Sequence, residues 1–203
     1  MIEKNVVTDF SSEASMPKIG PGSYIHPLAA VIGKVTVGKK VMVAPQASIR
    51  GDEGQPIHIG DEANVQDGVV IHALETEAKG KVVEKNLVTV QGERYAVYVG
   101  NRVSLAHQSQ IHGPAAVLDD TFVGMKALVF KSSVGSRCVI EPGVVLMGVT
   151  VPDRRYVPAG AVVTRQEQAD RLPEITDDYP MKDMNKGVVH VNTSLASAYL
   201  SAR

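Results

Sequence analysis

The stretch AAVIGKVTVGKKVMVAPQASIR, residues 29–50, decides the fold because a branched aliphatic residue returns every six positions, at Val31, Val37, Val43 and Ile49. An amphipathic helix would repeat its apolar residues every three to four positions, and a half-buried strand would repeat them every two. A period of six fits neither pattern. Short repeats of this kind stack into a solenoid, in which each unit buries its apolar residue against its neighbours.

The same period continues along most of the chain. It resumes at Ile59 after a step through residues 51–58, and at Val99 after a longer excursion through residues 73–98. Chains with such hexapeptide repeats resemble left-handed parallel β-helix proteins, in which three hexads make one triangular coil. The resemblance implies an all-β solenoid over residues 1–163, with inserted loops near 51–58 and 73–98.

The excursion and the C-terminal part carry their own signals. Residues 73–98 divide into a polar first half, expected to be mobile, and a hairpin that turns at Gln91–Gly92. Residues 164–203 are expected to be helical and to pack on the β-helix, with a short first helix that Thr164 begins and Pro173 ends. One apolar stripe at steps of four and three predicts a C-terminal α-helix, and its residues are interpreted as core packing: Met184, Val188, Val191, Leu195 and Ala198.

Composition excludes several classes of function. Lysine and arginine number 21 and the acids 22, which argues against nucleic acid or an anionic membrane as a partner. The single cysteine, Cys138, allows neither an intrachain disulfide nor a thiolate-rich zinc site. The sequence holds no apolar stretch long enough to span a bilayer, and MIEKNVVTDF is not a secretory signal. As written, the chain is expected to be soluble and cytoplasmic; a signal peptide removed earlier would make it extracytoplasmic, so the compartment stays open.

Three histidines in two short phrases suggest a metal site. His72 lies in VVIHALE, and His107 and His112 lie in SLAHQSQIHGP. A catalytic zinc site commonly has three protein ligands and one position open to water. His107 and His112 belong to consecutive hexads, so they are expected on adjacent faces of a coil with diverging side chains. A site between subunits solves this, with His107 of one protomer beside His72 and His112 of another, and three such interfaces close a cyclic homotrimer.

At these residues the chain resembles a γ-class carbonic anhydrase of the archaeal prototype-like subclass. The matching text is ASIRGDEGQPIHIGDEANVQDGVVIHALE, then YAVYVGNRVSLAHQSQIHGPAAV, then TFVGMKALVFKSSVG and YVPAGAVVT, within a resemblance that runs from Tyr24 to Asn192. It implies a lyase that converts CO2 reversibly into bicarbonate and a proton by means of a metal-bound hydroxide at subunit interfaces.

The resemblance also implies roles for single residues. His72, His107 and His112 match the metal ligands. Glu53 and Gln66 match groups beside the bound solvent and CO2. Glu75 matches the loop glutamate that transfers protons, and Asn192 matches a residue that reaches the site from the C-terminal helix. The remaining matches form a supporting network with an arginine–carboxylate contact across the interface: Arg50, Asp52, Asn64 and Asp67.

The chemistry of these residue types agrees with those roles. Three neutral imidazoles leave a metal with its full positive charge, so that bound water loses a proton near neutral pH. They suit Zn²⁺, and Co²⁺ or Fe²⁺ are compatible with the same ligands. A loop carboxylate such as Glu75 can carry the surplus proton to solvent.

Two departures from the family pattern carry expectations of their own. His190 stands in VVHVN where the prototype has Tyr, so the solvent network near Asn192 is expected to differ. The loop after Glu75, TEAKGK, is one residue shorter and less acidic, so proton transfer is expected to depend more on external buffer.

Two alternatives to the enzyme were weighed. In a hexapeptide acyltransferase one histidine would serve as a base, with a cleft for a long acyl-CoA and no metal. A catalytically silent β-helix assembly module could keep all three histidines. The presence of Glu53, Gln66 and Glu75 beside them favours the enzyme, whereas Arg50 with Asp52 equally fits a stabilising ion pair.

Overall fold

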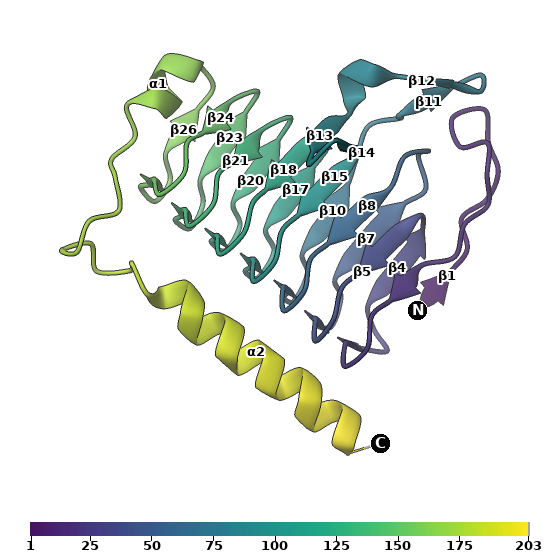
Figure 1. Cartoon of the computed structure of the whole chain (residues 1–203), viewed down its shortest axis with the longest axis horizontal. Helices are drawn as coiled ribbons and strands as arrows, with labels where there is room; N and C mark the ends of the chain where they lie inside the picture. Colours follow the sequence, from purple (N-terminus) through teal and green to yellow (C-terminus); the bar gives the residue numbers. More distant parts are fainter. Residues whose placement is uncertain (203) are drawn as a thin grey trace.

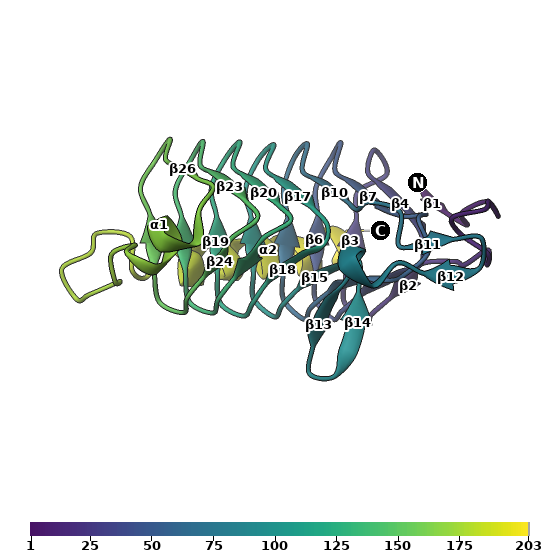
Figure 2. The same ribbon diagram turned by 90° about the horizontal axis from the view of Figure 1, so that it is seen from above.

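The computed structural model describes residues 1–202 and shows a three-sided prism of parallel strands with one long helix beside it (Figure 1). Each coil of the chain adds one short strand to each side, and the coils stack along the prism axis. Figure 2 shows the coils in a regular row, with a hairpin projecting from one side. The three sides are called face A, face B and face C below.

The strands of each face pair in parallel in the following orders. Face A consists of β1 (Ile2–Glu3), β4 (Ala30–Gly33), β7 (Ser48–Gly51), β10 (Val70–His72), β17 (Gln110–His112), β20 (Leu128–Phe130), β23 (Val145–Met147) and β26 (Val162–Val163). Face B consists of β2 (Lys18–Ile19), β5 (Val35–Val37), β8 (Ile57–Ile59), β15 (Val97–Val99), β18 (Ala115–Val117), β21 (Ser133–Val134) and β24 (Thr150–Val151). Face C consists of β3 (Tyr24–Ile25), β6 (Met42–Val43), β9 (Asn64–Val65), β16 (Ser104–Leu105), β19 (Phe122–Val123), β22 (Val139–Ile140) and β25 (Tyr156–Val157).

The aliphatic residues of the period-six pattern form the core, as predicted. On face A the parallel register sets Ile49 against Ile71 and Ile71 against Ile111, and all three side chains are fully buried. Each coil therefore rests a branched side chain on that of the next coil. Burial of one such side chain is worth about 1.5–3 kcal/mol, so the stacked ladder is the main source of stability.

The glycines that follow many of these aliphatic residues have a steric cause. Gly38, Gly60 and Gly100 stack where face B ends, with their backbones in close contact. A Cβ on Gly60 would lie 2.5 Å from the carbonyl carbon of Gly100, and one on Gly38 would lie 2.8 Å from that of Gly60. Only glycine allows the coils to approach so closely at this corner.

The excursion through residues 73–98 is folded over its whole length. Its first half forms the short antiparallel pair β11 (Glu77–Ala78) and β12 (Lys81–Val82) and a 3-10 turn, η1 (Glu84–Asn86), where only a polar, mobile segment was expected. The second half is the predicted hairpin of β13 (Val88–Val90) and β14 (Glu93–Tyr95). It projects from face B in Figure 2.

Two helices follow the last coil. The short helix α1 (Gln166–Asp170) begins after Arg165, one residue later than expected. The long helix α2 (Met184–Ser201) runs back along face C, where it contacts β3, β6, β9 and β16 (Figure 1). Neither helix combines the length and the hydropathy needed to cross a membrane within residues 1–202.

The interpretation of the apolar stripe of α2 as core packing holds only at the start of the helix. Met184 and Val188 are partly buried and pack against a buried cluster on face C, whereas Val191, Leu195 and Ala198 are exposed. The residues that α2 buries against face C are Asn185, Val189, Asn192 and Ala196. The helix is rotated so that its small and amide side chains touch the prism, which leaves the stripe on one flank. Two members of the stripe, Val191 and Leu195, are 53% and 41% exposed in the single chain.

Candidate metal centre

Two of the three histidines form a pair on the outer side of face A. His72 ends β10 and His112 ends β17, and the parallel register sets them directly side by side. Alternation along the strand turns Ile71 and Ile111 into the core and the two imidazoles outward. Their ring centroids are 5.6 Å apart and the rings are nearly perpendicular. Together with Arg50 they line a hollow of about 210 Å³.

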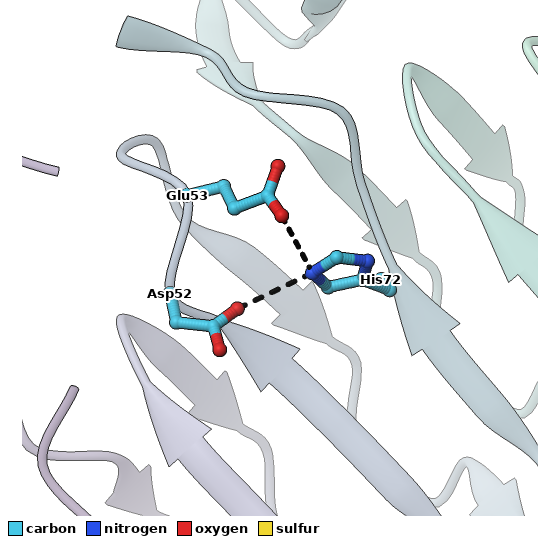
Figure 3. Close-up of side chains that lie close together, drawn as sticks. All are labelled: Asp52, Glu53 and His72. Carbon is cyan, nitrogen blue, oxygen red and sulfur yellow. Dashed lines mark hydrogen bonds and ion pairs between the residues drawn. The ribbon is translucent and has the colours of Figure 1, made fainter. Parts of the chain in front are cut away.

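His72 is surrounded by charged groups from the step at residues 51–58. Its Nε2 lies 3.1 Å from a carboxylate oxygen of Glu53 and 3.3 Å from one of Asp52, and Figure 3 shows both carboxylates aimed at that atom. The Arg50 guanidinium lies 3.0 Å from the same nitrogen and pairs with Asp52 at 3.2 Å. Burial, and then the positive charge of Arg50, hold the pKa of His72 below its usual range. The imidazole is therefore kept neutral, the form that binds metal.

Glu53 sits where a carboxyl group keeps its proton more readily than in water. Burial is the largest cause that raises its pKa, and the negative charges of Asp52 and Glu75 add to it, while Arg50 opposes them. Glu53 and Glu75 line one hollow together with Asp9 and Glu77. Glu53 therefore shares this hollow with three further acidic residues.

Hydrogen bonds anchor the loop that carries Glu75. The Thr76 hydroxyl donates to the Glu53 carbonyl at 2.5 Å and accepts the Gln55 N–H at 2.6 Å. The buried Asn86 side chain donates to the Glu75 carbonyl at 2.7 Å. The sequence pattern gave no signal for Thr76 or Asn86, because both lie in a stretch without periodicity.

The third histidine lies elsewhere on the chain. His107 sits in the turn between β16 and β17, at the corner of faces C and A, and its Nδ1 is 3.0 Å from Asp67. It lines a hollow of about 650 Å³ with Gln66, Asp67 and the flank of α2, Asn192 included. His190 lines a different groove, on the opposite flank of α2.

The amide groups near His107 are held in one orientation. The Asn64 side-chain NH2 donates to the buried Ser104 hydroxyl at 2.8 Å, and the Asn64 carbonyl oxygen accepts from the Gln66 NH2 at 2.9 Å. This arrangement leaves the Gln66 carbonyl oxygen, at the edge of the hollow, without a donor among residues 1–202. Ser104 belongs to this chain of hydrogen bonds. The sequence did not predict its role, because nothing in the sequence distinguishes it from other serines on β-strands.

The candidate residues therefore fall into two groups on one chain. The first group lies on or beside face A and consists of Arg50, Asp52, Glu53, Glu75, His72 and His112. The second group lies at the corner under α2 and consists of Asn64, Gln66, Asp67, His107 and Asn192. The arginine–carboxylate contact of the structure joins Arg50 to Asp52 of the same chain.

The ring nitrogens suit metal binding at both places. A carbonyl oxygen can only accept, so the contact of 3.2 Å from His112 Nδ1 to the Gly113 carbonyl puts the proton on Nδ1 and leaves Nε2 with a lone pair. Asp67 has the same effect on His107. Asp52, Glu53 and His72 also bring one ligand atom each within 4.8 Å of one another, which makes them the one cluster of three potential ligand residues within residues 1–202.

Comparison with known proteins agrees with this chemistry. The chain is 60% identical over 98% of its length to a carbonic anhydrase of Methanosarcina thermophila, of which it covers 81%. It is 30% identical over 84% of its length to the mitochondrial gamma carbonic anhydrase 2 of Arabidopsis thaliana, of which it covers half. It is also 40% identical over 96% of its length to a carboxysome assembly protein of a Nostoc species, but it spans only 33% of that protein. No family model matches the chain.

Solved structures confirm the fold class. A putative acetyltransferase of Bacillus cereus superposes on 93% of this chain with a TM-score of 0.69 at 21% identity, and the superposition covers 94% of the acetyltransferase. At that identity the likeness concerns the hexapeptide-repeat, left-handed β-helix fold alone. The three histidines, the carboxylates beside them and the relationship to named carbonic anhydrases over nearly the whole chain lead to one conclusion: this chain belongs to the γ-class carbonic anhydrase family.

Proposed function

We propose that this protein catalyses the reversible hydration of CO2 to bicarbonate and a proton, at metal centres that lie between the subunits of a homotrimer. The observation that carries the proposal is the separation of the histidines. His72 and His112 share face A, whereas His107 points from the next corner. A second copy of the chain that sets its His107 corner against face A would complete a three-imidazole site.

The surface of face A supports contact between copies. Beyond the histidine pair its outer side is apolar, and Met147 and Val162 are 43% and 59% exposed in the single chain. Phe130 lies in register with Met147 and continues this stripe from His112. The exposed flank of α2, with Val191 and Leu195, offers a second apolar surface beside His107. Burying two such surfaces against each other would stabilise a closed ring of subunits.

The donor set supports zinc as the metal. Three neutral imidazoles with an open position are a frequent Zn²⁺ site, and Co²⁺ or Fe²⁺ can use the same ligands. When bound, such a metal supplies an activated water as the nucleophile toward CO2. In the metal-loaded protein the Arg50 side chain would have to leave the His72 Nε2.

The residues around the site would orient the nucleophile and remove the proton. The carbonyl oxygen of Gln66 would accept the hydrogen of the attacking water, and the hydrogen bonds through Asn64 and Ser104 support this role because they hold the Gln66 side chain in one orientation. Glu53 stands beside His72 and would receive the proton that each turnover releases. Its neighbour Glu75 is exposed on the loop and would pass that proton to buffer.

The first experiment measures metal content and CO2 hydration by stopped flow on metal-loaded protein, chelator-treated protein and the variant His107→Ala. One metal per chain is expected, with hydration lost in the two controls. Metal bound without hydration would contradict the enzymatic role.

Mixing two inactive variants tests the shared site. His107→Ala keeps the face A pair, and His72→Ala keeps the His107 corner. In a trimer assembled from both, one of the three interfaces receives an intact set, so coexpression should restore part of the activity that each variant lacks alone. If all three ligands come from one chain, the mixture stays inactive.

A further inference from the structure

A groove of about 780 Å³ lies on the flank of α2 that faces away from His107. Its walls are the turns at the corner of faces B and C, the segment at residues 175–183 and the α2 residues Asn185, Lys186, Val189, His190 and Thr193. The residues that line the His107 hollow are on the other flank of the same helix. None of the candidate metal-centre residues takes part in this groove.

Charged residues stack along the corner of faces B and C, with one such residue in each coil. Each turn residue has a left-handed backbone, and its N–H donates to a carbonyl of the coil before it. The ladder runs in this order: Lys40, Glu62, Arg102, Asp120, Arg137 and Arg154. The charges alternate over the first four positions, where Lys40 pairs with Glu62 at 3.7 Å and Arg102 makes two bonds to Asp120. Arg137 continues the alternation at the fifth position, and Arg154 ends it at the sixth, so that two arginines follow each other.

The two arginines have no carboxylate partner within residues 1–202. Among these residues the Arg137 side chain makes no hydrogen bond or ion pair, and Arg154 reaches only the Ile175 carbonyl, at 3.5 Å. The groove is lined by four acids, but each one is already paired with a cation. The pairs are Glu62 with Lys40, Asp120 with Arg102, Asp177 with Lys182 and Asp183 with Lys186.

A second observation points to a ligand in the same groove. The Asn185 side chain is 8% exposed, and its NH2 donates to the Arg102 carbonyl at 2.8 Å. Its carbonyl oxygen is buried and has no partner among the described residues. A buried acceptor without a donor is costly, so a hydroxyl group or an ordered water in the groove would relieve it. Asn185 also belongs to the first turn of α2, whose N-terminus favours negative charge.

We propose that this groove binds a small phosphate monoester that carries a hydroxyl group. A phosphate monoester has close to two negative charges at neutral pH, which matches two guanidinium groups. Successive coils are about 4.8 Å apart, so one phosphate can accept hydrogen bonds from both arginines. Arginine binds such groups through paired N–H donors. The groove volume lies in the range of small-molecule sites, and the hydroxyl group would meet Asn185.

The test is isothermal titration of the metal-loaded protein with glycerol 3-phosphate and with inorganic phosphate, at constant ionic strength. The double variant Arg137→Gln/Arg154→Gln removes the unpaired charges. Arg171→Gln is the matched control, because Arg171 is exposed and lies outside the groove. We expect glycerol 3-phosphate to bind more tightly than inorganic phosphate. We expect the double variant to weaken that binding at least tenfold, by analogy with the loss of two charge-assisted contacts, while Arg171→Gln binds as the wild type does.

Controls separate this site from the metal centre. Neither Arg137 nor Arg154 is near the candidate ligands, so the double variant should keep full CO2 hydration. Binding that disappears when the metal is chelated but persists in the double variant would assign the anion to the metal centre and overturn the proposal. Absence of binding to the wild type would overturn it as well, and equal affinity for the two phosphates would refute recognition of an ester.

Discussion

At the scale of single residues, the site depends on carboxylates whose surroundings differ. Glu53 is half-buried beside Asp52 and His72, whereas Glu75 is exposed at the start of the loop. In the proposed mechanism Glu53 would exchange protons with the metal centre, and Glu75 would exchange them with solvent. A group that transfers protons efficiently has a pKa near the working pH, and burial raises the pKa of Glu53 toward that range.

The variant Glu75→Gln should make turnover depend on external buffer. An amide cannot carry a proton, so the surplus proton must leave Glu53 directly to buffer molecules. We expect CO2 hydration to fall by about 10²-fold in weak buffer and to recover as imidazole is added. Stopped-flow rates across an imidazole series measure this, with Glu93→Gln, an exposed glutamate of the projecting hairpin, as the control. A loss that is the same at every imidazole concentration would refute the relay role.

The variant Glu53→Gln should stabilise the metal-free protein at neutral pH. Because the folded-state pKa of Glu53 is raised, the fold disfavours its charged form, and this cost is present once the pH exceeds the folded pKa. Below the unfolded pKa both states are protonated and the cost vanishes. Thermal unfolding should therefore show a higher midpoint for Glu53→Gln at pH 7 and none of that gain near pH 4.

Glu93→Gln is again the control, since Glu93 is exposed on the hairpin. The same variant Glu53→Gln should lose activity at pH 7, so that stability and catalysis change in opposite directions. A gain in stability that persists undiminished at pH 4 would show that the charge of Glu53 is not its cause.

At the scale of elements, the period-six pattern predicted the strands because each hexad has one position that must be buried. The hairpin at Gln91–Gly92 and the helix α2 were predictable for the same kind of reason, since each has a local signal. The orientation of α2 was not. Its apolar stripe looks like core in the sequence, but Ala196 and Asn192 fit closer to face C than Leu195 would.

Side-chain anchors in the site escaped prediction for a different reason. Thr76, Asn86 and Ser104 act through single hydrogen bonds to partners that are distant in sequence. No periodic pattern marks such positions. The candidate ligands could be proposed because of their chemistry and their spacing, and the sequence could assign them to different faces only through the geometry of the coil.

Two glycine substitutions should have opposite effects on stability. In Gly60→Ala the new methyl group would lie 2.5 Å from the Gly100 backbone, so the coils must separate, at a cost of about 1–3 kcal/mol. In Gly187→Ala, on α2, the methyl group meets nothing within 4 Å, and a helical alanine gains about 0.5–1 kcal/mol over glycine. Chemical denaturation of both variants measures the difference. Equal effects would refute the close approach at the corner.

At the scale of the whole molecule, the proposed trimer would build each metal site from two different surfaces of the prism. Face A presents His72 and His112 above an apolar stripe, and the corner under α2 presents His107 beside Val191 and Leu195. Each half combines metal-binding groups with an uncovered apolar surface. The same contact that would bury the apolar residues would also bring the ligands together, so assembly and metal binding should be coupled.

A charge in the apolar stripe of face A should therefore abolish activity without touching the candidate ligands. In Met147→Glu a carboxylate replaces a side chain that is 43% exposed in the single chain. It costs the isolated prism little but would be buried without a partner in the assembly. We expect light scattering to show monomers, with low metal content and no CO2 hydration, while circular dichroism retains the β signal. Thr36→Glu, exposed on face B, is the matched control and should assemble normally. A Met147→Glu protein that remains trimeric and active would refute assembly through face A, whereas an active monomer would place all three ligands on one chain.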